Sequence, residues 1–280
     1  MFTIKLLGGL GNQMFQYALG RHLATKNKTE LVLDISDFQH YKLHKYSLGA
    51  FNIRAKILNE KRPNQNLLSQ RIIRKLKKIF SFLPNNFIDE PTPHFAAQIL
   101  NIKNNKTLTG YWQSEKYFKD IREIIKNDFT LNSQHEFKNR QKLELIKKIE
   151  SCNSISLHIR RGDYVNLKFN TNLEYYKNSI KFMQKNINSP VFFIFSDDIN
   201  WVKKNLKIEQ EHFYIQDNKN YEDITLMSLC KHNITANSTF SWWGAWLNNN
   251  KNKTVITPKI WFLKTEYNTK DLIPNSWIKI

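Results

Sequence analysis

Residues 154–165 read SISLHIRRGDYV, and this stretch decides the fold that the sequence predicts. Between Ile155 and Ile159 aliphatic residues alternate with polar ones, which predicts a half-buried β-strand. The strand runs into Arg160 and Arg161, and the glycine after them permits a tight turn. Because open α/β sheets bind ligands at the carboxyl ends of their strands, we expect both guanidinium groups at a binding edge.

The two arginines predict a phosphate site. An arginine is permanently charged, and its planar fork can hold a phosphate through paired hydrogen bonds. An exposed basic turn is the alternative in so basic a chain, but His158 before the pair and Gly162-Asp163 after it favour a diphosphate site. Residues two apart on a strand share a face, so Arg160 is expected beside His158, with Arg161 pointing the other way.

The phrase HIRRGDY at residues 158–164 resembles the H-x-R-R-x-D signature of the α1,2-, α1,6- and protein O-fucosyltransferase superfamily. It is most similar to the bacterial-type α1,2-fucosyltransferases, glycosyltransferase family 11. Three further phrases resemble the same family, so the resemblance covers essentially the whole chain: GGLGNQMFQYALGRHLA (8–24), GYWQSEKYF (110–118) and NSTFSWWGAWL (237–247).

The resemblance implies an α/β fold of GT-B type, with two Rossmann-like domains facing a central cleft. Residues 1–150 would form the acceptor-side domain, and residues 151–280 would bind GDP-fucose. The implied reaction is the inverting transfer of L-fucose from GDP-fucose to a glycan hydroxyl, expected to be O2 of a terminal galactose. The implied setting is surface polysaccharide or lipopolysaccharide biosynthesis, with no cofactor and no metal.

The resemblance also assigns roles to single residues. His158 is implied near the nucleotide, so Arg160 is expected as the direct diphosphate ligand and Arg161 as a supporting residue. Asp223 would accept hydrogen bonds from the N1–H and N2–H of guanine. Further donor contacts and a place near the reacting sugar are expected from hydroxyls, amides and glycine backbone at two helix starts: Asn237, Ser238, Thr239 and Phe240, and Gly11, Asn12 and Gln13.

The acceptor side and the catalytic base are less defined by the sequence. Tyr111 and Trp112 are expected either to stack on acceptor sugars or to be core aromatics, with Glu115 beside them. Candidates for the base are Asp34, Glu115 and Asp163, and a route without a base stays open. The adjacent Asp197-Asp198 pair is interpreted as a helix cap and site scaffold, without a metal.

Periodicity predicts the elements around these motifs. In the first half, strands are expected at 2–7 and 31–34, helices at 12–26 and 114–127, and a charged helix at 136–150. In the second half, the alternation predicts a parallel, doubly wound sheet. Its expected strands are 154–160, 191–195, 212–215, 233–236 and 254–257, and its expected helices are 173–187, 199–206, 220–231 and 239–248.

The composition restricts the classes of partner that the chain is expected to bind. The chain has 280 residues, 41% of them hydrophobic, and a formal net charge of +19, which predicts attraction to an anionic partner. Two cysteines give no disulfide framework, and no apolar run is long enough to span a membrane. We therefore expect a cytoplasmic protein. A basic amphipathic helix is expected at 69–83, either packed on the domain or touching an anionic inner membrane face.

Two other function classes remain as alternatives. Gly9-x-Gly11-x-x-Met14 after a strand, with Asp34 ending the next strand, imitates a dinucleotide-binding fingerprint and suggests an NAD-type oxidoreductase, although the third glycine is missing. The net charge suggests a nucleic-acid-binding protein. The aromatic residues cluster in 241–246 instead of alternating with lysines, which argues against nucleic acid as a partner.

Overall fold

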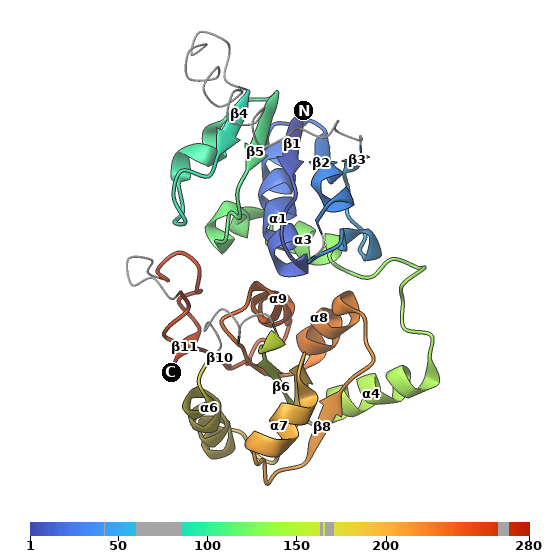
Figure 1. The fold of residues 1–280 in the computed structure, drawn as a ribbon, viewed down its shortest axis with the longest axis vertical. Helices are drawn as coiled ribbons and strands as arrows, with labels where there is room; N and C mark the ends of the chain where they lie inside the picture. The colour runs from blue at the N-terminus through green and yellow to red at the C-terminus, as the bar shows by residue number, and fades with distance from the viewer. Residues whose placement is uncertain (42, 60–85, 163–164, 166–170, 263–268) are drawn as a thin grey trace. The chain divides into compact units, whose positions relative to one another are not determined.

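The computed structural model describes residues 1–41, 43–59, 86–162, 165, 171–262 and 269–280 (Figure 1). The chain divides into two compact units. The first comprises residues 1–48 and 53–128, and the second comprises 49–52 and 129–280. This division differs from the expected boundary at residue 150. Helix α4 (Arg140–Ser151) contacts strand β6 of the second unit and buries Ile149 in its core.

The first unit contains a parallel five-stranded sheet in the order β3-β2-β1-β5-β4. Its strands are β1 (Phe2–Lys5), β2 (Leu31–Asp34), β3 (Lys56–Leu58), β4 (Phe87–Asp89) and β5 (Lys106–Thr109). Its α-helices are α1 (Leu10–Lys26) and α3 (Arg122–Asp128). Short 3-10 turns lie at Ser36–Gln39, Ala97–Asn101, Glu115–Tyr117 and Lys119–Ile121, and a further one, Leu48–Ala50, lies where the chain passes from the first unit into the second.

Helix α1 is buried around almost its whole circumference, so its apolar residues are not confined to one face of the helix. Gly20 lets it lie close to the sheet. A Cβ at this position would come within 2.5 Å of Ile4 Cγ1 and 2.7 Å of Leu31 Cδ1. The helix is therefore fixed against β1 and β2, and its N-terminal turn is held at the carboxyl end of β1.

The second unit contains a parallel six-stranded sheet in the order β11-β10-β9-β6-β7-β8. Its strands are β6 (Asn153–Ile159), β7 (Pro190–Ser196), β8 (His212–Ile215), β9 (His232–Ile234), β10 (Val255–Thr257) and β11 (Ile278–Lys279). Besides α4, its helices are α6 (Leu173–Asn186), α7 (Ile199–Asn205), α8 (Asn220–Leu229) and α9 (Thr239–Leu247).

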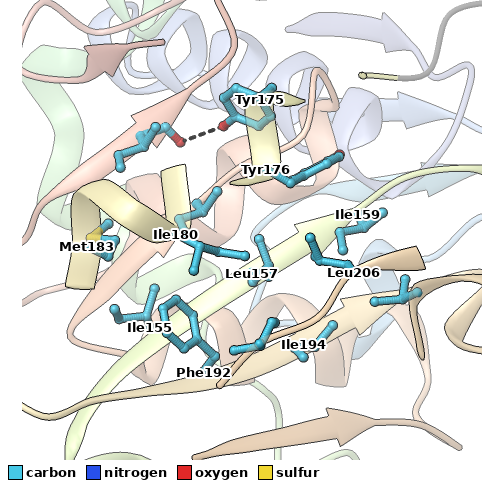
Figure 2. Close-up of a cluster of buried hydrophobic side chains, with 14 of the residues drawn as sticks. Ile155, Leu157, Ile159, Tyr175, Tyr176, Ile180, Met183, Phe192, Ile194 and Leu206 are labelled. Carbon is cyan, nitrogen blue, oxygen red and sulfur yellow. Dashed lines mark hydrogen bonds between the residues drawn. The ribbon is translucent and has the colours of Figure 1, made fainter. Parts of the chain in front are cut away.

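Two hydrophobic layers cover this sheet, as expected for a doubly wound fold. On one face, Phe192 and Ile194 pack with residues of α6 and α7 (Figure 2). Near them, the Tyr175 hydroxyl donates a 2.6 Å hydrogen bond to the carbonyl of Thr235. On the other face, Phe193 and Phe195 pack with residues of α4 and α8. The unbroken apolar run of β7 thus follows from burial on both sides.

Strand β6 is also buried on both faces, so the expectation that it is half-buried was wrong. Its polar residues are accommodated because neighbouring elements satisfy their hydroxyls. Ser154 Oγ accepts the backbone N–H of Lys231 at 3.0 Å, and Ser156 Oγ accepts Asn233 Nδ2 at 2.7 Å. The alternating polar residues of β6 therefore do not face solvent. The two serines form hydrogen bonds with residues in or beside the neighbouring strand β9.

Other differences concern mainly the first unit, although strand β11 of the second unit was also not expected. The single helix expected from 114 to 127 is replaced by two 3-10 turns followed by α3, and strands β3 and β4 were not expected. Within the described ranges, no helix is both long and apolar enough to cross a bilayer. The basic helix expected at 69–83 falls outside the described residues.

Candidate active site

The strand order of the second unit defines a binding edge. From β6 the chain proceeds to β7 and β8 on one side, and then returns to place β9 on the other side of β6. The order therefore reverses between β6 and β9, and a crevice forms at the carboxyl ends of such strands. The Arg160-Arg161 pair follows β6, and the loop that begins at Asn237 follows β9. The topology thus brings two of the sequence motifs to one point.

The two arginines have different surroundings. Arg161 is 15% exposed, its guanidinium lies 3.6 Å from the centre of the Trp201 ring, and its Nε donates to Asp198 Oδ2 at 3.2 Å. Arg160 is 29% exposed and its Nη1 lies 3.0 Å from Asp197 Oδ2. The more exposed Arg160 is the better placed to meet a ligand, whereas Arg161 is stacked and paired within the unit.

The carboxylates after β7 hold this turn together. Asp197 also accepts the backbone N–H of Arg161 at 2.8 Å, and Asp198 caps α7 by accepting the N–H of Trp201 at 3.1 Å. A Cβ at Gly162 would come within 2.7 Å of Asp197 Oδ2. The interpretation of this aspartate pair as a helix cap and scaffold is confirmed, and the carboxylate of Asp197 approaches Gly162 closely.

His158 is almost completely buried on β6. Burial, and then the charge of Arg160, lower the pKa of His158 to about 3, so the imidazole is neutral at pH 7. Its ring lies 5.5 Å from that of Phe240, and its Nδ1 has no hydrogen-bond partner among the described residues. A buried imidazole nitrogen without a partner suits a hydrogen bond to a ligand.

The loop after β9 presents small polar groups at the start of α9. Asn237 is buried, and its Oδ1 accepts the Thr171 hydroxyl at 2.9 Å. Ser238 caps the helix, because its Oγ accepts the N–H of Phe240 at 3.3 Å. Thr239 and Phe240 remain partly exposed. The helix start and its hydroxyls provide hydrogen-bonding groups suited to an anion.

Asp223 lies in the first turn of α8. Its Oδ1 accepts a 2.9 Å hydrogen bond from Asn218 Nδ2. Burial raises the pKa of the Asp223 carboxyl to about 6, and the Asn218 hydrogen bond opposes that shift. Helix α8 packs against α9. The structure therefore brings this carboxyl near the helix that carries Thr239 and Phe240.

The first unit has the same kind of edge. The chain runs from β1 to β2 and β3, and then returns to place β5 on the other side of β1. Gly8, after β1, has φ +78°, and a Cβ there would lie 2.6 Å from Asn12 Nδ2. Asn12 is partly exposed, and its Oδ1 accepts Gln113 Nε2 at 3.0 Å. Asn12 thus sits at the reversal point, while Gly11 is buried in the same turn.

Two glutamines in α1 support this edge from inside. Gln13 is fully buried, and its amide spans the chain: Nε2 donates to the carbonyls of Gly8 and Lys45 at 2.9 Å, and Oε1 accepts the N–H of Ser47. The expected donor contact of Gln13 is corrected, because its amide is committed to the backbone. Gln16 joins β1 to β5 by bonding to Leu7 and Gly110. Sequence reasoning missed Gln16, since a buried glutamine carries no local signal.

Tyr111 and Trp112 diverge after β5. Trp112 is fully buried against Tyr117, so its expected acceptor role is corrected in favour of the core alternative. Tyr111 is 45% exposed. Two features send the neighbouring side chains in different directions. The two carboxylate oxygens of Glu90 accept the N–H groups of Tyr111 and Trp112 at 2.7 and 2.9 Å, and Trp112 has a positive φ of +57°. Sequence reasoning did not identify Glu90.

The candidate bases receive different outcomes. Asp34 is 2% exposed, and its Oδ1 accepts the backbone N–H and the hydroxyl of Ser36. It caps a turn, so its expected role as base is corrected. Glu115 is partly exposed and lies 3.9 Å from Arg122. Asp163 lies outside the described residues and stays a prediction. The described ranges contain no group of three His, Cys, Asp or Glu residues that could hold a metal.

The two parallel α/β sheets, each with a reversal of strand order, and the arginine-bearing edge of the second sheet are features of a nucleotide-sugar-dependent glycosyltransferase of GT-B type. The family model of glycosyl transferase family 11 matches residues 1–280. The chain therefore belongs to this family. Membership favours the glycosyltransferase hypothesis over the oxidoreductase and nucleic-acid-binding alternatives.

Relatives are similar over nearly the whole chain. An Escherichia coli "Alpha-1,2-colitosyltransferase" is 36% identical over 99% of this chain and 97% of its own length. The Escherichia coli "O-antigen biosynthesis glycosyltransferase WbnK" is 34% identical over 98% of this chain and 99% of its own. A Bos taurus "Galactoside alpha-(1,2)-fucosyltransferase 2" is 24% identical over 88% of this chain and 69% of its own.

One solved structure supports the fold class. The crystal structure of NodZ α-1,6-fucosyltransferase co-crystallized with GDP matches with a TM-score of 0.50 and 14% identity, covering 87% of this chain and 91% of that one. The expected GT-B-type α/β fold is confirmed. That the two units face each other across a cleft, and that they divide the acceptor and donor between them, remain predictions.

Proposed function

We propose that this chain transfers L-fucose from GDP-fucose, with inversion, to O2 of a terminal galactose in a cell-surface glycan. The phrase HIRRGDY at residues 158–164, which resembles the family signature, and the names of the relatives support this choice. GDP-colitose is a second candidate donor, because a 36% identical relative is named a colitosyltransferase. Colitose is L-fucose without its 3-hydroxyl, so one pocket can distinguish them by a single hydrogen bond.

The observation that carries the proposal is the position of Arg160. It lies at the carboxyl end of β6, beside the strand-order reversal, two residues after a buried, neutral His158. When the glycosidic bond breaks, negative charge develops on the departing diphosphate. A guanidinium already fixed by Asp197 can stabilise that charge without reorganising. The helix start at Ser238 supplies further donors for the phosphate oxygens.

Asp223 would select guanine as the nucleobase of the donor. Guanine presents adjacent N1–H and N2–H donors, and a carboxylate is an acceptor-only group that can take both. The acceptor hydroxyl must lose its proton, and Glu115 or Asp163 would accept it, unless the transition state is dissociative enough to need no base. The proposal includes no metal and places the enzyme in the cytoplasm, at the inner face of the membrane.

The test is a two-donor assay. The full chain is incubated with GDP-fucose or GDP-colitose and a panel of galactose-terminated and galactose-free acceptors, with and without excess chelator. We expect a product whose new linkage, determined by NMR, is to O2 of galactose, with the anomeric configuration opposite to that of the donor. A different linkage refutes the acceptor assignment. Loss of activity in chelator that Mg²⁺ or Mn²⁺ restores refutes metal independence.

A further inference from the structure

A cavity of about 240 Å³ lies at the carboxyl end of the first unit's sheet. Residues from three strand ends line it: Leu6, Leu7 and Gly8 after β1, Asp37, Phe38 and Tyr41 after β2, and Tyr111 after β5. It therefore straddles the strand-order reversal of this unit, which is where α/β sheets bind ligands. None of the roles assigned above uses Asp37, Phe38 or Tyr41.

The walls combine exposed aromatic rings with one carboxylate. Tyr41 is 42% exposed and Tyr111 is 45% exposed, although both belong to a residue type that usually buries its ring. The Phe38 ring lies 6.2 Å from that of Tyr41, edge to face. Burial, the nearby Tyr41 hydroxyl and the Glu90 carboxylate raise the pKa of the Tyr111 hydroxyl, so the two tyrosines are electrostatic neighbours.

The charge and size of the cavity restrict its occupant. The carboxylate of Asp37 lies 2.7 Å from Lys5 Nζ, so this pair adds no net charge. A nucleotide diphosphate would meet no free cation among the lining residues. Pockets for drug-sized ligands are typically about 300–1,000 Å³, so this one suits a single small ring. Aromatic faces match the C–H face of a pyranose, and the Asp37 carboxylate can accept hydrogen bonds from its hydroxyls.

We propose that this cavity holds a neutral hexose ring of the acceptor glycan, stacked between Tyr41 and Tyr111 and hydrogen-bonded by Asp37. The inference rests on the proposed glycosyltransferase function and adds residues that determine its acceptor specificity. Glu90 acts as a positioning residue, since its hydrogen bonds to two backbone N–H groups hold the Tyr111 ring at the cavity.

The kinetic test compares Tyr41→Ala, Tyr41→Phe and Asp37→Asn with Phe87→Ala. Phe87 is a suitable control because it is an exposed aromatic ring of the same unit outside the cavity. Tyr41→Ala should raise the acceptor KM about tenfold, with donor KM and acceptor-independent donor hydrolysis unchanged. Asp37→Asn should raise the acceptor KM as well. Tyr41→Phe keeps the ring and should restore the KM to about twofold of wild type, and Phe87→Ala should not change it.

A donor-free test separates this inference from the proposed function. Saturation-transfer NMR of methyl β-galactoside with the full chain should give a signal for wild type and Phe87→Ala, and none for Tyr41→Ala. That result supports the cavity even if neither GDP-fucose nor GDP-colitose proves to be the donor. An unchanged acceptor KM in Tyr41→Ala, an increase in donor KM instead, or no sugar signal with the wild type overturns the proposal.

Discussion

The two sheet edges of this enzyme share a topology and differ in chemistry. In each unit the first strand lies between a strand that follows it and a strand added later on its other side. The second unit places two arginines there, each paired with its own aspartate. The first unit places amides and aromatic rings there instead, such as Asn12 and Tyr111. We propose that the edge of the second unit binds a charged diphosphate and that the edge of the first unit binds a neutral sugar.

The difference extends to how each edge is held. In the second unit, charged side chains hold charged side chains, because a guanidinium aimed at a ligand needs a carboxylate to keep it in place before the ligand arrives. In the first unit, buried amides hold the backbone, as Gln13 does between Gly8, Lys45 and Ser47. The edge of the first unit also carries the Lys5–Asp37 ion pair, which adds no net charge.

The largest expected effect separates the two neighbouring aromatics of the neutral edge. Trp112→Ala should destabilise the fold by about 3–5 kcal/mol, because it empties a fully buried site. Tyr111→Ala should change the free energy of unfolding by less than about 1 kcal/mol, because the side chain is half exposed. Urea unfolding of both variants measures this. Equal destabilisation would mean that Tyr111 is a core residue and faces no ligand.

The next effect separates the two arginines of the charged edge. Arg160→Lys keeps the charge but loses the fork, and should lower turnover by about 10²–10³ without lowering the melting temperature. Arg161→Lys should keep measurable turnover and lose about 1 kcal/mol of stability, since it loses the stack on Trp201. Steady-state kinetics and thermal melts decide it. If Arg160→Lys is the more active variant, the assignment reverses.

A smaller effect concerns the pH dependence of donor binding. Because the pKa of Asp223 is raised to about 6, donor affinity should increase as pH rises from 5 to 7.5, when the carboxylate forms. Asp223→Asn should weaken GDP-fucose binding by about tenfold at pH 7.5 and remove this dependence. Titrations at several pH values measure both. A wild-type affinity that is flat across pH 6 contradicts the role.

The raised pKa of Asp223 also makes the stability of the fold depend on pH, and this dependence is opposite to that of donor affinity. The folded pKa lies above the unfolded value of about 3.9, so the native state binds more protons between these pH values. Stability should therefore fall as pH rises from about 4 to 6. In Asp223→Asn, this part of the decrease in stability with rising pH should be absent. A loss of this pH dependence distinguishes removal of a titrating carboxyl from general misfolding of the variant.

The second unit could be predicted closely from the sequence. Several of its strands are short apolar runs, and β8 and the starts of α6, α7, α8 and α9 lie where periodicity placed them. Helix α4 begins at Arg140 instead of at the expected residue 136. The first unit was less accessible. Strands β3 and β4 are short and partly exposed, so they carry no apolar pattern, and their assignment depends on pairing with distant β2 and β5.

The site residues show the same limit. Arg160 ends one predicted strand and Asp197 follows another, so the sequence alone placed both at the carboxyl ends of strands. Trp112 and Gln13 sit in equally suggestive phrases, yet tertiary contacts decide that both are structural. Whether a tryptophan faces a ligand or the core depended here on a positive φ and on a carboxylate 22 residues away in sequence, neither of which its neighbours reveal.

The central claim is that the edge of the second unit binds the charged diphosphate and that the edge of the first unit does not. A calorimetric titration of GDP into the full chain tests this claim most directly. GDP carries the diphosphate and lacks the sugar, so it should report the charged edge alone. Arg160→Lys should weaken GDP binding by about tenfold or more, and Tyr111→Ala should leave it within about twofold of wild type. Unchanged GDP affinity in Arg160→Lys, together with a loss in Tyr111→Ala, would contradict the account.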